Sequence, residues 1–399
     1  MDIVRTIQKF NAGRDPERLA MKYTNMRSNS FVFLRATCHL FYNRLPDGRL
    51  FERAPLTWVC GDLHLENFGS YKGDNRLVYF DFNDFDEGAL APATWELVRF
   101  LASILIWAKC LQVSRPQAIT LCKVFVDAYA TALTEGKARW VERETADGMV
   151  LQLLESVQNR PRPAFLDSRT ERRGAKRPIR LDGRKALPAN DRQREKISRF
   201  MKEFAATQPN PGFYKTIDIA RRIAGNGSLG VDRYIIVVEG KGSPDGNYLL
   251  DLKESRPSAL TPHLKAKQPR WKSEAQRIVA IQRQVQATSM AFLQPVSIGR
   301  TSYVLRGLQP SEDRVALDRW NRQIARLQAV IKTMGEIVAW GQLRSSGRDG
   351  SAIADELIDF GERHNWRGEL LDAAEHCAEL VERDWNTYIH AFDSGAFKL

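Results

Sequence analysis

Short apolar runs rich in β-branched and aromatic residues predict two groups of strands. The first group comprises residues 56–59 and 77–80, and both strands lead into segments rich in Asp and Asn. The second group comprises residues 217–220, 234–239, 248–253 and 303–310. Because catalytic side chains are common where strands end in loops, we expect the chemistry to follow the first group.

Apolar residues at helical spacing predict helices between and after these strands. One helix is expected after Pro92, and another after Ser273, which is a suitable N-cap for residues 274–281. A longer helix is expected over residues 320–344. Strands and helices in separate groups indicate an α+β fold.

Composition and length fit a two-lobed enzyme. The chain has 399 residues, of which 43% are hydrophobic, so it can bury a sizeable core. No apolar run is long enough to cross a bilayer, and the first residues do not predict a signal peptide. Five cysteines without paired spacing fit a cytoplasmic protein.

The acidic segments after the first two strands have the residue types of a phosphotransferase site. Mg²⁺ neutralises phosphate charge and is held by carboxylate and amide oxygens, so Asn67, Asp81 and Asp84 are the candidate metal ligands. We expect Asp81 to matter more than Asp84. Asp62, five residues before Asn67 in the D-x-x-x-x-N spacing, is the candidate base for an acceptor hydroxyl.

Two other interpretations of these segments are open. Asp, Asn and Gly are also common in ordinary turns, so each cluster taken alone has a structural explanation. Cys60 and His64 are zinc-ligand types, but no second pair accompanies them at the spacing of a zinc finger.

A glycine-rich segment lies between two of the later strands. Gly225, Gly227 and Gly230 match G-x-G-x-x-G, and Ser228 lies among them. A β-branched run follows instead of a helix, which favours a hairpin over phosphates rather than a dinucleotide fold. We therefore expect Gly225, Gly227, Ser228 and Gly230 to bind nucleotide.

Lys253 ends the predicted strand 248–253 and is the candidate lysine for the nucleotide phosphates. Glu274, at the start of the next helix, is its expected partner. An exposed edge-strand lysine and a simple capping carboxylate are the alternatives. The connection at residues 307–310 would then offer backbone groups to adenine.

The net charge of +12 is concentrated between residues 158 and 196, where four prolines interrupt a run of thirteen Lys and Arg side chains. We expect little regular structure there. A solvated linker is one interpretation, and a dock for an anionic acceptor or nucleic acid is the other. No aromatic residue follows Phe165 within the segment, which weakens the case for single-stranded nucleic acid.

The chain resembles the bacterial domain of unknown function 2252 (DUF2252) family, which is related to the protein-kinase-like superfamily. The resemblance rests on residues 31–35, 60–69, 81–87, 222–230 and 252–254. Residues 60–67 are also similar to the H-G-D-L-H-x-x-N loop of aminoglycoside and choline kinases, with Cys60 in place of His. Asn83 stands where those kinases carry Gly, and Leu343 where relatives tend to carry His.

The resemblance implies a kinase-like two-lobed fold in circularly permuted order, because the catalytic and metal loops precede the glycine loop. Its expected parts are a large-lobe portion at 1–150, a connecting segment at 151–212, a nucleotide-binding small lobe at 213–310, and a helical return to the large lobe at 311–399. It also implies an ATP- and Mg²⁺-dependent phosphotransferase. A nucleotide-binding pseudokinase, a nucleotidyl transferase and a basic nucleic-acid-binding protein are the alternatives.

Overall fold

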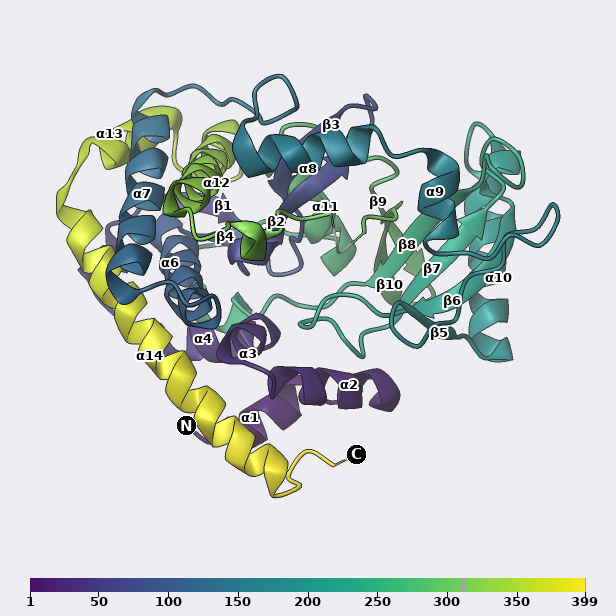
Figure 1. Cartoon of the computed structure of the whole chain (residues 1–399), viewed down its shortest axis with the longest axis horizontal. Helices are drawn as coiled ribbons and strands as arrows, with labels where there is room; N and C mark the ends of the chain where they lie inside the picture. Colours follow the sequence, from purple (N-terminus) through teal and green to yellow (C-terminus); the bar gives the residue numbers. More distant parts are fainter. Residues whose placement is uncertain (311–312, 399) are drawn as a thin grey trace.

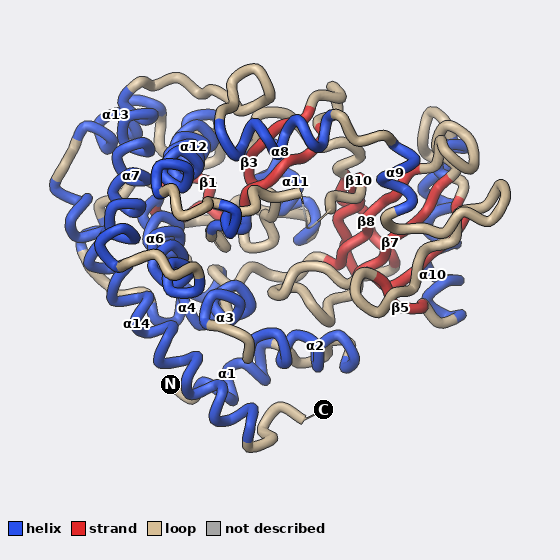
Figure 2. Tube along the Cα trace, in the orientation of Figure 1, coloured by secondary structure: helices blue, strands red, loops and turns tan. Residues whose placement is uncertain are grey.

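The computed structural model describes residues 1–310 and 313–398, and it combines a helical region with a region built on an antiparallel sheet (Figures 1 and 2). The mixture of helix and sheet confirms the α+β prediction. Within the described residues, no helix has both the length and the apolar character of a membrane span.

The helical region contains the largest apolar core. Long α14 runs along its outer edge, and α6 lies in the interior with most of its side chains buried (Figure 1). The N-terminal helices extend from this region toward the sheet. The helices that build the region are α1 (Ile3–Phe10), α2 (Pro16–Met26), α3 (Ser30–Ala36), α4 (Cys38–Arg44), α5 (Arg49–Glu52), α6 (Ala93–Cys110), α7 (Arg115–Thr134), α8 (Gly148–Gln158), α12 (Ile324–Arg344), α13 (Ala354–Glu362) and α14 (Asn365–Asp393).

Two short antiparallel ladders carry the acidic segments. β1 (Leu56–Val59) pairs with β4 (Ala89–Pro92), and β2 (Phe68–Lys72) pairs with β3 (Val78–Phe82). The first strand leads into the loop containing Asp62, and β3 ends just before Asp84. The strands predicted at 56–59 and 77–80 are therefore confirmed.

The sheet region has six strands in the order β5-β6-β7-β8-β10-β9. Apolar residues of α10 (Asp191–Ala206) cover one face, and α9 (Arg162–Asp167) with Ile179 covers part of the other. The helix α11 (Glu274–Val285) follows β8, and its Ser273 cap is confirmed by a 3.2 Å bond from the Gln276 amide. The strands are β5 (Ala186–Pro188), β6 (Thr216–Arg222), β7 (Arg233–Val238), β8 (Tyr248–Glu254), β9 (Gln294–Ile298) and β10 (Thr301–Gly307).

The helix expected from residue 320 begins at Ile324. Asn321 and Arg322 have φ values of 55° and 56°, which a right-handed helix does not accept. The chain therefore turns there before the periodic apolar residues of α12 start.

The basic segment at 158–196 is more ordered than we expected. It includes α9, β5 and the first turn of α10, and several of its charges meet distant acids. Arg177 is fully buried and contacts Asp167 at 2.5 Å and Asp245 at 2.6 Å, while Arg160 lies 2.7 Å from Asp313. The prediction of little regular structure was wrong because a charge run alone does not show that acids elsewhere in the chain will pair with it.

A buried charge cluster lies on the face of the sheet that is turned toward the helical region. Asp251 has no exposed surface and accepts ion pairs from Arg222 at 2.7 Å, Arg233 at 2.6 Å and Arg306 at 3.3 Å. These arginines come from three different strands, so one carboxylate cross-links β6, β7 and β10 through β8. The three guanidinium groups together hold the pKa of Asp251 well below its usual range, against the effect of burial.

We expect Asp251→Ala to destabilise the protein by about 3–5 kcal/mol, because it leaves three arginines buried without their shared acid. Asp127→Ala removes a carboxylate that is exposed and paired with Arg367, and it is the control with an expected loss below about 1 kcal/mol. Urea denaturation followed by circular dichroism measures both variants. Equal, small losses would show that the cluster does not hold the sheet together.

Candidate functional site

A cleft of about 580 Å³ lies where the two acidic loops, the glycine loop and the N-terminal helices meet. Asp62, Asn67 and Asp84 line it from the helical region. Residues 225–228 of the glycine loop line it from the sheet region. Most residues predicted for the site from sequence are therefore brought to one cavity, although they lie up to about 165 positions apart in the chain.

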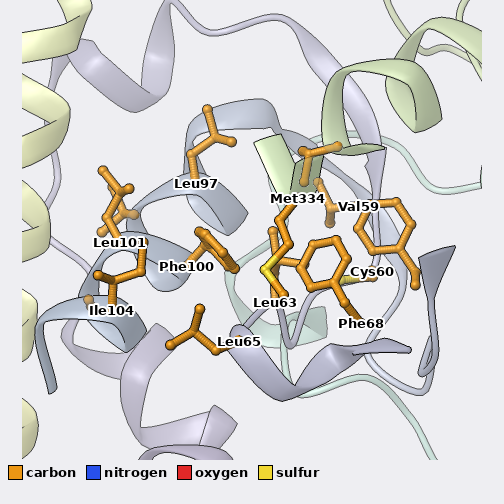
Figure 3. Close-up of a cluster of buried hydrophobic side chains, with 14 of the residues drawn as sticks. Val59, Cys60, Leu63, Leu65, Phe68, Leu97, Phe100, Leu101, Ile104 and Met334 are labelled. Atoms are coloured by element: carbon orange, nitrogen blue, oxygen red, sulfur yellow. The ribbon is translucent and has the colours of Figure 1, made fainter. Parts of the chain in front are cut away.

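The loop that carries Asp62 is anchored by three buried apolar side chains. Cys60, Leu63 and Leu65 are buried in the core beside α6, as Figure 3 shows. Gly61 has a φ of 82° and lies against the backbone of Glu87, so a side chain there would be both strained and obstructed. The contact at Gly61 therefore fixes the backbone of this loop against the second acidic loop, residues 83–88.

Asp62 is held by a buried arginine on the side away from the cleft. Arg99 of α6 has no exposed surface, and its Nε donates to Oδ1 of Asp62 at 2.8 Å while a second guanidinium nitrogen contacts the same oxygen. The other carboxylate oxygen, Oδ2, lies 4.0 Å from Nε2 of His64. Arg99 thus orients the carboxylate and leaves one oxygen available on the cleft side.

Asn67 cross-links the two acidic loops. Its side-chain nitrogen donates to the carbonyl of Asp62 at 3.0 Å and to that of Asp84 at 3.2 Å. Its side-chain oxygen accepts from the Asp84 amide at 2.9 Å. Asn67 is buried, so these bonds fix the distance between the loops, and its carbonyl oxygen still has one lone pair free.

Asp84 faces the cleft and is paired with the sheet region. Its Oδ2 lies 3.5 Å from Nζ of Lys253, which also contacts Asp86. Burial works to raise the pKa of Asp84, but the charges of Lys253 and Arg306 lower it to about 2. Asp84 is therefore ionised at neutral pH, and about half of its side chain is exposed to accept a further cation.

Asp81, expected to be the principal metal acid, does not line the cleft. It is buried and accepts from the amides of Phe82 at 2.9 Å and Ala287 at 3.1 Å, with Arg344 at 3.6 Å. Burial raises its pKa. The chain has two Asp-Phe pairs three residues apart, and it is the acid of the second pair, Asp84, that lines the cleft. The expected ranking of Asp81 over Asp84 is thus not supported by where the two side chains lie.

Glu274 is not the partner of Lys253. Its carboxylate lies 2.7 Å from Nε of Arg277, one turn along α11. Lys253 is 5% exposed and pairs with Asp86 and Asp84 instead. The pairing we expected was wrong because Glu274 pairs with Arg277 of its own helix. The guanidinium of Arg277 also donates to carbonyls of the second acidic loop.

The glycine segment does form a hairpin, since β6 and β7 are antiparallel neighbours. Gly225 and Gly230 have φ values of 72° and 84°, which explains why these positions carry glycine. Within the described chain, the amide groups of residues 225–228 make no hydrogen bond. Free amides in a row can donate hydrogen bonds to a phosphate oxygen.

The connection at residues 307–310 does not line this cleft, and two of its backbone groups are bonded to other strands. The Leu308 amide donates to Leu249 at 2.8 Å, and the Gln309 carbonyl accepts from Arg222 at 2.6 Å. Leu308 also belongs to the apolar cluster that Leu166 and Ile179 cover. Any nucleotide bound in the cleft would therefore have its base away from this connection.

Several residues of the site were missed in the sequence. Asp86 and Glu87 line the cleft, and burial raises the pKa of Glu87 to about 7, with Asp62 and Asp86 adding to the rise. The repeated acids in residues 84–87 were the available signal. Arg99 and Glu96 had no such signal. Both lie on α6, whose apolar pattern does not show that these two charged side chains are buried against the Asp62 loop.

No three of His, Cys, Asp and Glu among the described residues are grouped as a metal site. The fit of Mg²⁺ therefore depends on Asp84 and Asn67, whose oxygens each retain a free lone pair. Mg²⁺ commonly takes one or two protein oxygens and completes its shell with phosphate and water. These two residues fit that mode of binding.

Glu96 of α6 supports the Asp62 loop by accepting a hydrogen bond from its backbone. Because burial affects its pKa, the stability of the protein at different pH values tests this arrangement. It is 1% exposed, it accepts from the Cys60 amide and from Gln342, both at 3.0 Å, and burial raises its pKa to about 7. The folded state therefore binds this proton more tightly than the unfolded state. Stability due to Glu96 is complete below about pH 4, the unfolded pKa, and is lost as the pH rises to about 7.

We expect Glu96→Gln to remove this loss, so that the variant gains up to about 3 kcal/mol relative to the native protein between about pH 5 and pH 8. Urea denaturation at each pH measures the difference. Glu195→Gln, at an exposed position, is the control and should follow the native curve. Parallel curves for Glu96→Gln and the native protein would contradict the role of burial.

The family model described as "Uncharacterized protein conserved in bacteria (DUF2252)" matches residues 14–391. This match includes both acidic loops, the glycine hairpin and Lys253. No curated protein and no solved structure matches the chain. Because the model covers nearly the whole sequence, the chain belongs to the DUF2252 family.

Proposed function

We propose that the protein is an ATP- and Mg²⁺-dependent phosphotransferase with its site in the cleft between the acidic loops and the glycine loop. The observation that carries the proposal is that Asp62, Asn67 and Asp84 line one wall of the same cavity as residues 225–228. Phosphoryl transfer needs an acid near the acceptor, oxygens for the metal and amides for phosphates. Those groups come together here from separate parts of the chain.

Asp84 and Asn67 would hold Mg²⁺, which neutralises phosphate charge during transfer. Asn67 has the further task of fixing the spacing between Asp62 and Asp84 through its three hydrogen bonds. Lys253 balances the charge of Asp84 and Asp86 and keeps them close to the sheet region.

Asp62 would take the proton of the acceptor hydroxyl. The acceptor oxygen forms a bond to the γ-phosphorus as the bond from that phosphorus to the bridging oxygen breaks, and ADP leaves with the electron pair. Arg99 holds Oδ1 of Asp62, so Oδ2 is the oxygen that receives the proton. Two contacts from Arg99 hold the carboxylate, so the contribution of Arg99 to the reaction is to orient Asp62.

Transfer of the nucleotidyl group is the second candidate, and one observation favours keeping it. The connection at 307–310 does not line the cleft, so a nucleotide bound in the cleft lacks the adenine site that a protein kinase provides. A nucleotide held differently could present its α-phosphorus to the acceptor, with pyrophosphate as the leaving group.

We expect Asp62→Asn to keep affinity for Mg-ATP and to lose transfer by about a thousandfold, or roughly 4 kcal/mol of transition-state stabilisation. The assay incubates protein and cell extract with γ-labelled or α-labelled ATP. Label from the γ position identifies phosphoryl transfer, and label from the α position identifies nucleotidyl transfer. The control is Asp372→Asn at an exposed position; unchanged transfer in Asp62→Asn would exclude Asp62 as the base.

We expect Asp84→Asn to abolish the Mg²⁺-dependent part of the rise in melting temperature with ATP, since a ligand that binds only the folded state raises it. Asp81→Asn should lower the melting temperature of the free protein yet retain the rise with Mg-ATP. The reverse pattern would show that the metal acid is Asp81, as the sequence alone suggested.

A further inference from the structure

Two buried cations behind the glycine loop have no carboxylate partner in the described part of the chain. Arg14 is 8% exposed and Lys22 has no exposed surface. Arg14 donates to the carbonyls of Gly227 at 2.7 Å and Leu229 at 3.0 Å, and Lys22 donates to Gly227 at 3.1 Å and Asn11 at 2.8 Å. Within the described residues, neither cation has an acid at ion-pair distance.

Burying a positive charge without an acid to pair with it costs free energy, and this cost lowers the pKa of both side chains. Burial lowers the pKa of Arg14 to about 10, with Arg256 adding to the effect. Burial also lowers the pKa of Lys22, and the charge of Arg14 lowers it further. The carboxylate that acts on both is Glu87, but one of its oxygens is held by the Ala259 amide.

A third polar group of the same wall is unused. His39 of α4 is 6% exposed and lines the cleft, and neither of its ring nitrogens has a hydrogen bond to any residue that the structure describes. Its ring is stacked on Phe10 of α1 at 3.8 Å between centroids. Buried polar groups are normally hydrogen-bonded, so unsatisfied ring nitrogens in a cavity indicate a ligand that forms hydrogen bonds with them.

We propose that α1, α2 and α4 complete an oxyanion site with the glycine loop, in which a phosphoryl group binds between the free amides of residues 225–228 and the wall of Arg14 and His39. Lys9 of α1 lines the same cavity at its exposed end. The anion offsets the positive charge of this wall, and it accepts from amides that have no partner among the described residues.

This site needs neither metal nor transfer chemistry, so it can hold even where the proposed function fails. The phosphoryl group could belong to the nucleotide itself or to an anionic acceptor. In the first case the N-terminal helices are part of the nucleotide site, and in the second they bind the acceptor next to it.

Calorimetric titration of the full chain with pyrophosphate, without divalent metal, tests the site. We expect Arg14→Gln to weaken pyrophosphate binding by about tenfold. Arg27→Gln on the same segment is the control, because it removes the same charge from an exposed pair with Asp393 and should bind as the native protein does. Lys9→Gln is a surface change that should not impair folding, and we expect it to weaken binding by about threefold.

Repeating the titration with saturating Mg-ATP distinguishes the two sources of the phosphoryl group. Competition would identify the nucleotide's own phosphates, and unchanged pyrophosphate binding would identify a separate anionic acceptor. Native affinity in both Arg14→Gln and Lys9→Gln would overturn the site, as would an equal loss in Arg27→Gln.

Discussion

The structure depends on how basic side chains of the sheet region hold the second acidic loop. Lys253 pairs with Asp84 and Asp86, and Arg277 donates to the carbonyls of Gly88 at 2.5 Å and Asp86 at 2.8 Å. These contacts join β8 and α11 to a loop that belongs to the helical region. They hold Asp84 at the cleft. They also hold the sheet close to the acidic loops, so that the glycine loop lines the same cleft.

The site is therefore assembled from parts that no single segment contains. Asn67 fixes the two acidic loops to each other, and Gly61 lets their backbones meet. Arg14 and Lys22 fix the glycine loop to the N-terminal helices through its carbonyls. The carbonyls of that loop are thus used for support, while its amides stay available. This division suits a loop that must be rigid and still bind an anion.

Local features of the sequence predicted much of the fold. The strands of β1, β3, β7 and β8 and the Ser273 cap follow from patterns within a few residues, and those patterns act through neighbours in the chain. The candidate residues Asp62, Asn67 and Asp84 were also recognisable, because their spacing and the strand before each could be seen directly.

What the sequence did not predict depends on contacts between distant residues. Whether Asp81 or Asp84 faces the cleft is decided by Ala287 and Lys253, which lie about 200 and 170 positions away. The partner of Lys253 depends on the direction in which α11 leaves the sheet. The basic segment is ordered by Asp245, Asp218 and Asp313. Charge pairs of this kind carry no local signal.

The central claim is that Asp84, Asn67 and the glycine loop belong to one metal–nucleotide site. A crystal structure of the protein with Mg²⁺ and a non-hydrolysable ATP analogue tests it most directly. The account predicts Mg²⁺ at about 2.1 Å from an oxygen of Asp84, with phosphate oxygens facing the amides of residues 225–228. A nucleotide bound outside this cleft, or Mg²⁺ on Asp81, would contradict it.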